Sequence, residues 1–195
     1  MRQNNIADQL SLFATDAGTP EGFRYEPELL AGEEETALLA DLEKLAFKEF
    51  EFHGFSGKRR VVSFGWRYDF SRAKLDEAAP IPQFLLPIRE KAAQFAAVDP
   101  RVLEHVLVTE YGPGAAIGWH KDRAMFADVI GVSLLSSCTF RFRKKVGNGW
   151  ERTSVRLEPR SAYLLRGAVR TDWEHSIPGV EQLRYSLTFR NFRAP

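Results

Sequence analysis

The sequence predicts a mainly β protein with flanking helices (α+β), in which a jelly roll forms the core. Between residues 102 and 193, short apolar or alternating segments follow one another and are separated by turns rich in Gly, Pro and Asn. Before them, two segments carry apolar residues at helical spacing. About eight short antiparallel strands in such a stretch are typical of two packed sheets, so we expect a jelly roll preceded by N-terminal helices.

The length and charge are those of a single globular domain. At 195 residues, with 44% hydrophobic residues, the chain can enclose an apolar core. Residues 1–20 are mostly polar and are expected to form a tail, with residues 21–195 as the domain. A net charge of +1 excludes a uniformly basic protein, so nucleic-acid binding would use a local patch.

We expect a cytoplasmic monomer that does not bind membranes. Cys138 is the single cysteine, which excludes an internal disulfide framework and fits a reducing compartment. No apolar run approaches the ~20 residues that span a bilayer, and the first residues lack the apolar region of a signal peptide.

The N-terminal third is expected to mix helix and strand. Residues 23–26 can form a short strand. Residues 32–46 form a helix, because Leu38, Leu42 and Leu45 give an apolar stripe. Residues 47–55 alternate between apolar and polar, which predicts a strand, and 54–60 are expected to form a loop with a cationic end.

The segment 61–70 is extended and unusually aromatic. A period of two places four rings on one face, namely Phe64, Trp66, Tyr68 and Phe70. Two interpretations stay open. The rings pack a sheet against the core, or they form a surface on which a base stacks, with Arg60 and its cationic neighbours at the phosphates.

The rest of the chain is one helix followed by strands. The helix spans 80–97 and is opened by a Pro-Ile-Pro sequence. The strands are expected at 102–111, 117–122, 128–136, 139–143, 151–157, 160–165 and 183–192, with a hairpin turn at Gly147-Asn148-Gly149.

A candidate metal site lies in the strand that contains Trp119-His120-Lys121-Asp122. His120 and Asp122 are two residues apart, so in extended chain both side chains lie on one face. His175 is the best candidate for a third ligand. Two histidines and one carboxylate form the facial triad of non-haem Fe(II) oxygenases, which leaves three coordination positions for substrates.

Two arginines follow the distal histidine. Arg184 and Arg190 are six residues apart in a predicted strand, and this even spacing places both on one face. Two inward guanidinium groups are costly without anionic partners, and a dicarboxylate co-substrate would supply them.

The order of these motifs resembles the AlkB-like family of 2-oxoglutarate- and Fe(II)-dependent dioxygenases. The resemblance rests on Tyr-Gly-Pro-Gly from Tyr111, the His-x-Asp pair, the distal His and the final Arg-x5-Arg with Tyr-Ser-Leu-Thr-Phe inside it. It is most specific over residues 106–192. It implies a double-stranded β-helix at about 102–193 and a nucleotide-recognition lid at about 47–70.

The resemblance also implies the roles of the site residues. His120, Asp122 and His175 would bind Fe(II). Arg184 matches the residue that pairs with the distal carboxylate of 2-oxoglutarate, and Tyr111 matches a hydroxyl that donates to it. The 2-oxoglutarate site would further contain Arg190, Thr109 and Ser186, the last two standing where well-known members have Asn. Arg60, Phe64, Trp66 and Tyr68 would contact substrate.

The implied activity is demethylation of N-alkylated bases in DNA or RNA, single-stranded substrate included, with Fe(II), 2-oxoglutarate and O2 and with release of formaldehyde, succinate and CO2. One departure concerns Ala124, which stands where DNA-repair members often have a second acidic residue. Three alternatives therefore stay open. They are an RNA-modifying enzyme, a hydroxylase or demethylase of protein side chains, and a catalytically silent jelly-roll sensor.

Overall fold

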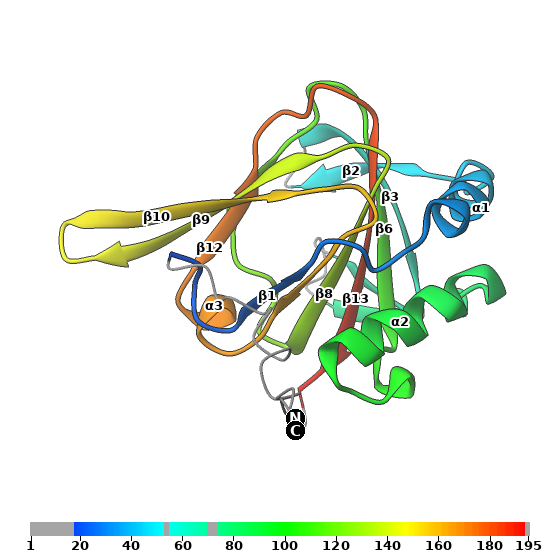
Figure 1. Cartoon of the computed structure of the whole chain (residues 1–195), viewed down its shortest axis with the longest axis horizontal. Helices are drawn as coiled ribbons and strands as arrows, with labels where there is room; N and C mark the ends of the chain where they lie inside the picture. The colour runs from blue at the N-terminus through cyan, green and yellow to red at the C-terminus, as the bar shows by residue number, and fades with distance from the viewer. Residues whose placement is uncertain (1–17, 53–54, 70–73, 194–195) are drawn as a thin grey trace, which may run out of the picture.

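Two facing sheets dominate the computed structural model, which describes residues 18–52, 55–69 and 74–193 (Figure 1). The larger sheet has seven strands in the order β1-β11-β8-β13-β6-β3-β2. The smaller has four in the order β10-β9-β12-β7, and β4 and β5 form a separate ribbon. The prediction of a β-rich jelly roll with flanking helices is confirmed.

The strands of the large sheet are β1 (Phe23–Glu26), β2 (Lys48–Phe52), β3 (Phe55–Phe64), β6 (His105–Tyr111), β8 (Phe126–Leu134), β11 (Ala162–Leu165) and β13 (Arg184–Phe192). Those of the small sheet are β7 (Ile117–His120), β9 (Cys138–Val146), β10 (Gly149–Leu157) and β12 (Glu174–Ile177). The ribbon consists of β4 (Trp66–Asp69) and β5 (Lys74–Glu77), and the α-helices are α1 (Gly32–Leu42), α2 (Leu86–Ala96) and α3 (Ala168–Thr171).

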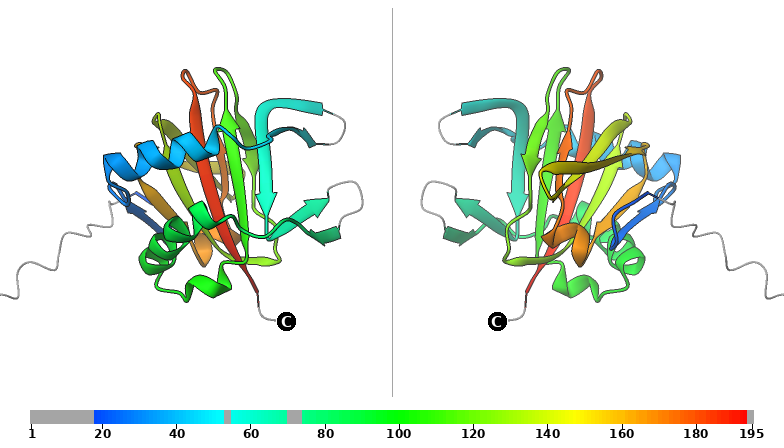
Figure 2. Two further views of the ribbon diagram at one scale, coloured as in Figure 1. Left: turned by 90° about the vertical axis from the view of Figure 1, so that its right-hand side faces the viewer. Right: turned by 90° about the vertical axis from the view of Figure 1, so that its left-hand side faces the viewer.

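Helices α1 and α2 cover the outer face of the large sheet (Figures 1 and 2). Their apolar stripes, which include Leu38 on α1 and Ala92 on α2, join one buried cluster with outward residues of β6, β8 and β13. Tight packing of this cluster fixes which face of each strand is turned outward, because a slip by one residue would exchange the two faces.

Strand β13 shows the alternation most clearly. Leu187 and Phe189 are buried in the cluster under the helices. Arg184, Ser186 and Arg190 point the other way and line a cavity between the sheets. The polar residues are therefore placed inside the protein by the same alternation that places the apolar ones under the helices.

A second apolar cluster fills part of the space between the two sheets. Val129 and Tyr163 of the large sheet pack there with Phe140 and Phe142 of the small sheet. The Tyr163 ring lies across Gly131, where a Cβ atom would be 2.2 Å from that ring. Glycine at this position thus lets an aromatic ring enter the interior.

Several element boundaries differ from the sequence prediction. Helix α1 ends at Leu42, and α2 is preceded by the 3-10 helix Gln83–Leu85. Strand β3 begins at Phe55, where a loop was expected, because it pairs with β2 and β6 along its length. Helix α3 and strands β5 and β12 were not predicted. They are four residues long each, too short for a clear periodic pattern.

The segment predicted as a lid forms two extensions at one edge of the body. Figure 2 shows β2–β3 and β4–β5 projecting side by side on the same side. Lys48 and Glu49 of β2 and Glu77 of β5 line the cavity, so both extensions border its opening. Their function as a lid stays a prediction. The helices within the described ranges are all too short or too polar to cross a lipid bilayer.

Candidate active site

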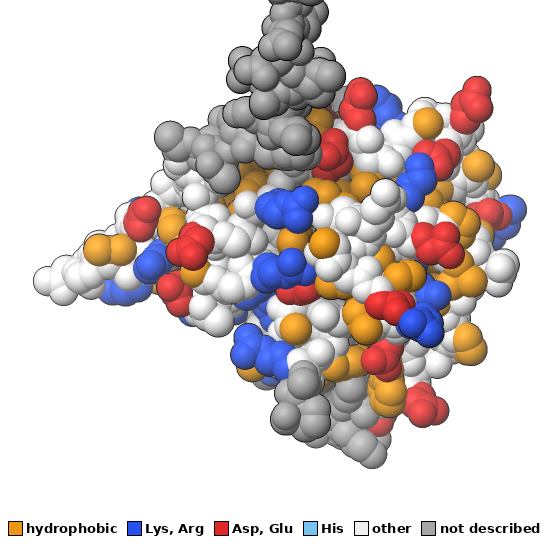
Figure 3. Space-filling model, turned by 60° about the horizontal axis from the view of Figure 1, so that its bottom comes forward, with side chains coloured by type: hydrophobic (Ala, Val, Ile, Leu, Met, Phe, Trp, Pro, Cys, Tyr) orange, Lys and Arg blue, Asp and Glu red, His pale blue; other side chains and the backbone are white. Residues whose placement is uncertain are grey.

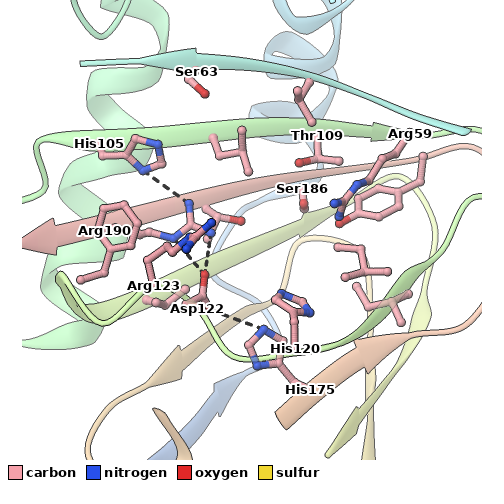
Figure 4. A pocket seen from close by; sticks show the side chains of 18 of the residues that line it. Arg59, Ser63, His105, Thr109, His120, Asp122, Arg123, His175, Ser186 and Arg190 are labelled. Atoms are coloured by element: carbon pink, nitrogen blue, oxygen red, sulfur yellow. Dashed lines mark hydrogen bonds and ion pairs between the residues drawn. The ribbon is translucent and has the colours of Figure 1, made fainter. Parts of the chain in front are cut away.

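A cavity of about 1520 Å³ lies between the two sheets (Figure 4). Inward-facing residues of β3, β6, β7, β12 and β13 line it. All three predicted metal ligands and all five predicted 2-oxoglutarate contacts are among the lining residues, namely His120, Asp122, His175, Thr109, Tyr111, Arg184, Ser186 and Arg190. The fold thus brings together residues that are up to 81 positions apart in the sequence, since 190 minus 109 is 81.

The two histidines face each other across neighbouring strands. β12 pairs with β7 in a register that sets His175 directly opposite His120. Their ring centroids are 4.3 Å apart. Nδ1 of His120 is 2.9 Å from the Gly118 carbonyl oxygen, so this nitrogen carries a proton, and Nε2 is the ring nitrogen left for a metal. Burial lowers the pKa of His175 to about 3, which leaves its imidazole in the neutral form that binds a metal.

Asp122 follows the end of β7 and lies between two guanidinium groups. Arg190 donates to its Oδ1 from Nη2 at 2.9 Å and from Nε at 3.2 Å. Arg170 of α3 places Nη1 at 3.8 Å from Oδ2. Burial by itself would raise the pKa of Asp122, but the opposing charges, Arg190 first, hold it below its usual range. The carboxylate is ionised and one oxygen is free of hydrogen bonds from the arginines.

The donor set fits a divalent metal ion. Asp122 Oδ2 is 3.4 Å from His175 Nε2. Neighbouring ligands of a six-coordinate ion with bonds of about 2.1 Å lie roughly 3 Å apart, so this spacing is suitable. Among the described residues, no three His, Cys, Asp or Glu side chains lie close enough together, as they stand, to form a complete metal site. The ligands are neighbours that an ion would draw together by side-chain rotation.

The other end of the cavity contains a buried guanidinium that lacks partners. Arg184 is 1% exposed, and Nη2 donates to the Ser133 hydroxyl at 3.1 Å. Its Nε and Nη1 have no hydrogen-bond partner. The Tyr111 ring lies 4.9 Å from the guanidinium carbon. A buried cation with two free donors requires an anion, and a carboxylate can accept charge-assisted hydrogen bonds from such donors.

Thr109 and Ser186 lie between these two ends. They are opposite each other in the β6–β13 register, and both line the cavity. Figure 4 shows their hydroxyl groups in the middle of the pocket floor. They can hydrogen-bond a ligand that extends from the histidines toward Arg184, although their side chains are shorter than the Asn of the resembled family.

Three cavity or supporting residues were not among the predicted residues of the metal and 2-oxoglutarate sites; Arg59 was considered only as a phosphate contact, His105 only as a structural residue, and Arg170 not at all. Arg59 lines the cavity, and burial lowers its pKa. His105 lies 3.4 Å from Arg190 Nη1 through its Nδ1, and burial lowers its pKa to about 3. Arg170 donates to the carbonyl of Arg123 in the loop after Asp122 and to the carbonyls of Phe126 and Ala127 at the start of β8. For His105, a usable signal was present in the sequence: its even spacing from Thr109 and Tyr111 places all three on one face of the strand.

The expected substrate contacts are mostly placed elsewhere. Phe64 is 8% exposed within the cluster under the helices, so the prediction that it stacks on a base is wrong. Arg60 lies on the outward face of β3, forms an ion pair with Glu110 and does not line the cavity, and its contact with substrate stays a prediction. Trp66 packs edge-on against Phe192 at 5.9 Å and does not line the cavity. The side chain of Tyr68 lies outside the described residues.

Phe64 and Trp66 do not continue one strand face, because the strand is interrupted between them, and Phe70 lies outside the described residues. Gly65 has φ of 76° and separates β3 from β4. A Cβ atom there would be 1.8 Å from the Glu104 carbonyl oxygen, so only glycine allows this close approach. The alternate residues of β3 that face the cavity are Arg59, Val61 and Ser63. The predicted contacts Arg60 and Phe64 are each shifted by one residue and therefore lie on the opposite face.

Comparison with known proteins identifies relatives of this site. The sequence model of the 2OG-Fe(II) oxygenase superfamily matches residues 24–190. The chain is 28% identical over 200 residues to "Alkylated DNA repair protein ALKBH8 homolog" of Arabidopsis thaliana, covering 90% of this chain and 56% of that protein. It is 28% identical over 124 residues to uncharacterized protein L905 of Acanthamoeba polyphaga mimivirus, covering 57% of this chain and 58% of that protein. The chain thus spans less than two thirds of each curated relative.

A solved structure shares the fold. "The structure of OsALKBH1" superposes with a TM-score of 0.68 at 15% identity, covering 89% of this chain and 99% of that chain. The family match includes both ends of the cavity described above. Membership implies Fe(II) as the metal, with 2-oxoglutarate and O2 as co-substrates. The chain belongs to the 2OG-Fe(II) oxygenase superfamily and is an AlkB-like dioxygenase.

Proposed function

We propose that this dioxygenase demethylates N-alkylated bases in nucleic acid. One observation carries the proposal: a single cavity has two imidazoles and a carboxylate at one end and, at the other, the buried guanidinium of Arg184 with two donors left without a partner. In this assignment His120, Asp122 and His175 hold Fe(II), and Arg184 binds the distal carboxylate of 2-oxoglutarate. The bound metal, 2-oxoglutarate and O2 would supply the oxidation of a methyl group to hydroxymethyl, with succinate and CO2 as co-products.

The chain's own side chains prepare this site. Arg190 keeps Asp122 ionised and fixes Oδ1, which leaves Oδ2 toward His175. The Gly118 carbonyl fixes the His120 tautomer. The ring of Tyr111 packs against Arg184, and Thr109 and Ser186 offer hydroxyl groups between the two ends. We assign these residues to positioning 2-oxoglutarate.

A nucleobase suits the remaining space and the opening. A cavity of about 1520 Å³ exceeds the usual 300–1,000 Å³ of small-molecule pockets, so it has room for a base beside 2-oxoglutarate. Arg59 and Arg123 line it and can face phosphates. A base turned out of its strand would enter between the two edge extensions. The name of the Arabidopsis relative, which refers to alkylated DNA repair, supports the same class of substrate. An N-hydroxymethyl product would then release formaldehyde and leave the unmethylated base.

Formaldehyde release from methylated oligonucleotides tests the proposal. The full chain is incubated with Fe(II), 2-oxoglutarate and air, together with DNA or RNA strands carrying N-methylated adenine or cytosine. Unmodified strands and the variant Asp122→Ala are the controls, and Lys44→Ala, at an exposed position just after α1, is the matched variant that keeps activity. Turnover of 2-oxoglutarate with peptides alone would replace this proposal by a protein hydroxylase. Binding of 2-oxoglutarate without any turnover would indicate a sensor.

A further inference from the structure

The β9–β10 hairpin projects beyond the small sheet (Figures 1 and 3). β9 and β10 pair along their whole length, from Cys138 opposite Leu157 to Val146 opposite Gly149. Strand β12 supports β9 only as far as Arg143. The part from Lys144 to Glu151 therefore extends from the body without a further strand beside it. This arm is a feature that the proposed reaction does not use.

One face of the arm carries an alternating stack of cations and indole rings. Register and strand alternation place the odd-numbered residues of β9 on the face opposite His175 and Phe142. The guanidinium of Arg143 lies 4.6 Å from the Trp119 ring and 4.2 Å from the Trp150 ring. Arg141 adds a cation 5.0 Å from Trp119, and Lys145 adds one 5.3 Å from Trp150. We call these five side chains the Trp–Arg ladder.

The ladder has an excess of positive charge. Among the strand residues on this face, five are cationic and one is a carboxylate, namely Arg141, Arg143, Lys145, Arg152 and Arg156 against Glu174. Arg156 is compensated by an ion pair with Glu158, just beyond β10. Glu174 forms an ion pair with Arg143. The remaining excess of three charges is concentrated on one face of a chain whose total charge is only +1. Such a local excess attracts a polyanion.

Trp150 gives the face an accessible aromatic surface. It is 37% exposed, which makes it one of the few large hydrophobic residues in the described part of the chain to be so accessible. Lys145, the cation over its outer side, is exposed and can move to a phosphate when a base arrives. Base stacking on an aromatic ring and cations along a backbone are the two components of single-strand binding.

The ladder begins beside the candidate metal site. Trp119 directly precedes His120 on β7, the edge strand of the small sheet. His120 faces the cavity, and the Trp119 ring lies against Arg141 and Arg143 at the margin of the same cavity. From Phe142, which is level with His175, to the tip at Val146 the hairpin extends by four residues, or about 13 Å. The ladder thus leads from the edge of the active site toward the tip of the arm.

We propose that the Trp–Arg ladder is a binding surface for single-stranded nucleic acid outside the active-site cavity. Phosphates contact Arg141, Arg143, Lys145 and Arg152, and one base stacks on Trp150. The inference rests on the proposed function for its choice of polyanion and extends it to a second contact surface. Cation–π contacts within the hairpin do not by themselves explain why it carries uncompensated positive charge. Each exposed contact contributes only about 0.5–1 kcal/mol, and this gain is opposed by repulsion among the cations.

Binding of unmodified strands tests the ladder without requiring catalysis. Fluorescence anisotropy is measured with the full chain and labelled 12-nucleotide DNA and RNA single strands over a range of salt concentrations. Trp150→Ala is expected to weaken binding about fivefold or more, because one stacked base contributes about 1–3 kcal/mol. Lys145→Gln is expected to reduce the slope of log K against log salt by about 0.7. Trp150→Phe, which keeps a ring, is expected to retain most of the affinity.

Two controls make the result specific. Lys44→Gln removes an exposed cation just after the end of α1, a helix that lies on the opposite side of the molecule from the hairpin in Figure 1, and it is expected to leave affinity and slope unchanged. Thermal unfolding of each variant checks the fold. If Trp150→Ala and Lys145→Gln bind the strands as tightly as the unmodified chain, the ladder proposal is wrong. Binding to anionic lipid vesicles without binding to strands would also overturn it.

The outcomes separate this inference from the proposed function. Release of formaldehyde from a methylated mononucleotide reports on the cavity alone, and the ladder variants are expected to keep it. Demethylation with no ladder-dependent strand binding would keep the enzyme proposal and remove the ladder. Ladder-dependent strand binding with no demethylation would do the reverse.

Discussion

Replacing Arg184 by Met tests the assignment of the 2-oxoglutarate site most directly. Arg184 is 1% exposed, and its Nε and Nη1 are left without partners. Methionine has a similar length and no charge. In the absence of 2-oxoglutarate we expect the variant to be at least as stable as the unmodified chain, because it removes a buried cation with two unsatisfied donors.

The same substitution should strongly weaken binding of 2-oxoglutarate. Two charge-assisted hydrogen bonds at about 1.5 kcal/mol each amount to about 3 kcal/mol, or roughly a 150-fold rise in Kd. Thermal unfolding is measured without oxygen while 2-oxoglutarate is titrated. The unmodified chain should gain about 2.7 kcal/mol of stability at a concentration 100 times its Kd, and the variant should gain well under 0.5 kcal/mol there.

Arg160→Met is the matched control, because Arg160 is partly exposed and lies outside the cavity lining. It should not change the response to 2-oxoglutarate. The reasoning would be refuted if Arg184→Met bound 2-oxoglutarate within threefold of the unmodified chain, or if it were several kcal/mol less stable before the acid was added.

Three further predictions concern the metal end. Asp122→Ala should abolish metal binding and formaldehyde release. It should also destabilise the fold by about 3 kcal/mol, because Arg190 loses its buried partner. Elemental analysis measures the bound metal, and urea unfolding measures the stability. Arg170→Met should lower metal affinity about 10- to 100-fold by loosening the loop after Asp122, as a metal titration would show, and unchanged affinity would contradict this. The metal-free protein should lose stability below pH 6.5. His105 and His175 have folded pKa values of about 3, so the unfolded state takes up protons first and the loss is about 1.4 kcal/mol per pH unit for each. Urea unfolding from pH 7 to pH 5 should show it, and His105→Gln should halve the slope.

The residues on β13 show how far local pattern reaches. The six-residue spacing of Arg184 and Arg190 determines that they share a face, and the apolar residues between them determine that the other face is covered. Both arginines therefore face the cavity as predicted. The His-x-Asp spacing placed its two side chains together in the same way, although Asp122 lies just beyond the end of β7.

The arginines on β3 show where local pattern fails. Arg59 and Arg60 are adjacent cations, and nothing nearby in the sequence distinguishes the inward one. Their orientation comes from pairing with β6, in which Arg59 is opposite Tyr111 and Arg60 opposite Glu110. The turn at Gly65 then changes the face of the following residues. Contacts between strands about 50 residues apart decide this, and sequence periodicity does not record them.

The two faces of β13 have different functions, and this limits which sequence changes the strand can tolerate during evolution. Side chains toward the helices and side chains toward the cavity alternate along the seven residues from Arg184 to Arg190, with β6 and β8 hydrogen-bonded on either side. Residues on one side can be exchanged while the other side stays as it is, so substrate preference can drift without loss of the hydrophobic interior. Loss or gain of a single residue in this strand would instead swap the lining and the interior along the remainder of the strand, and both would fail together.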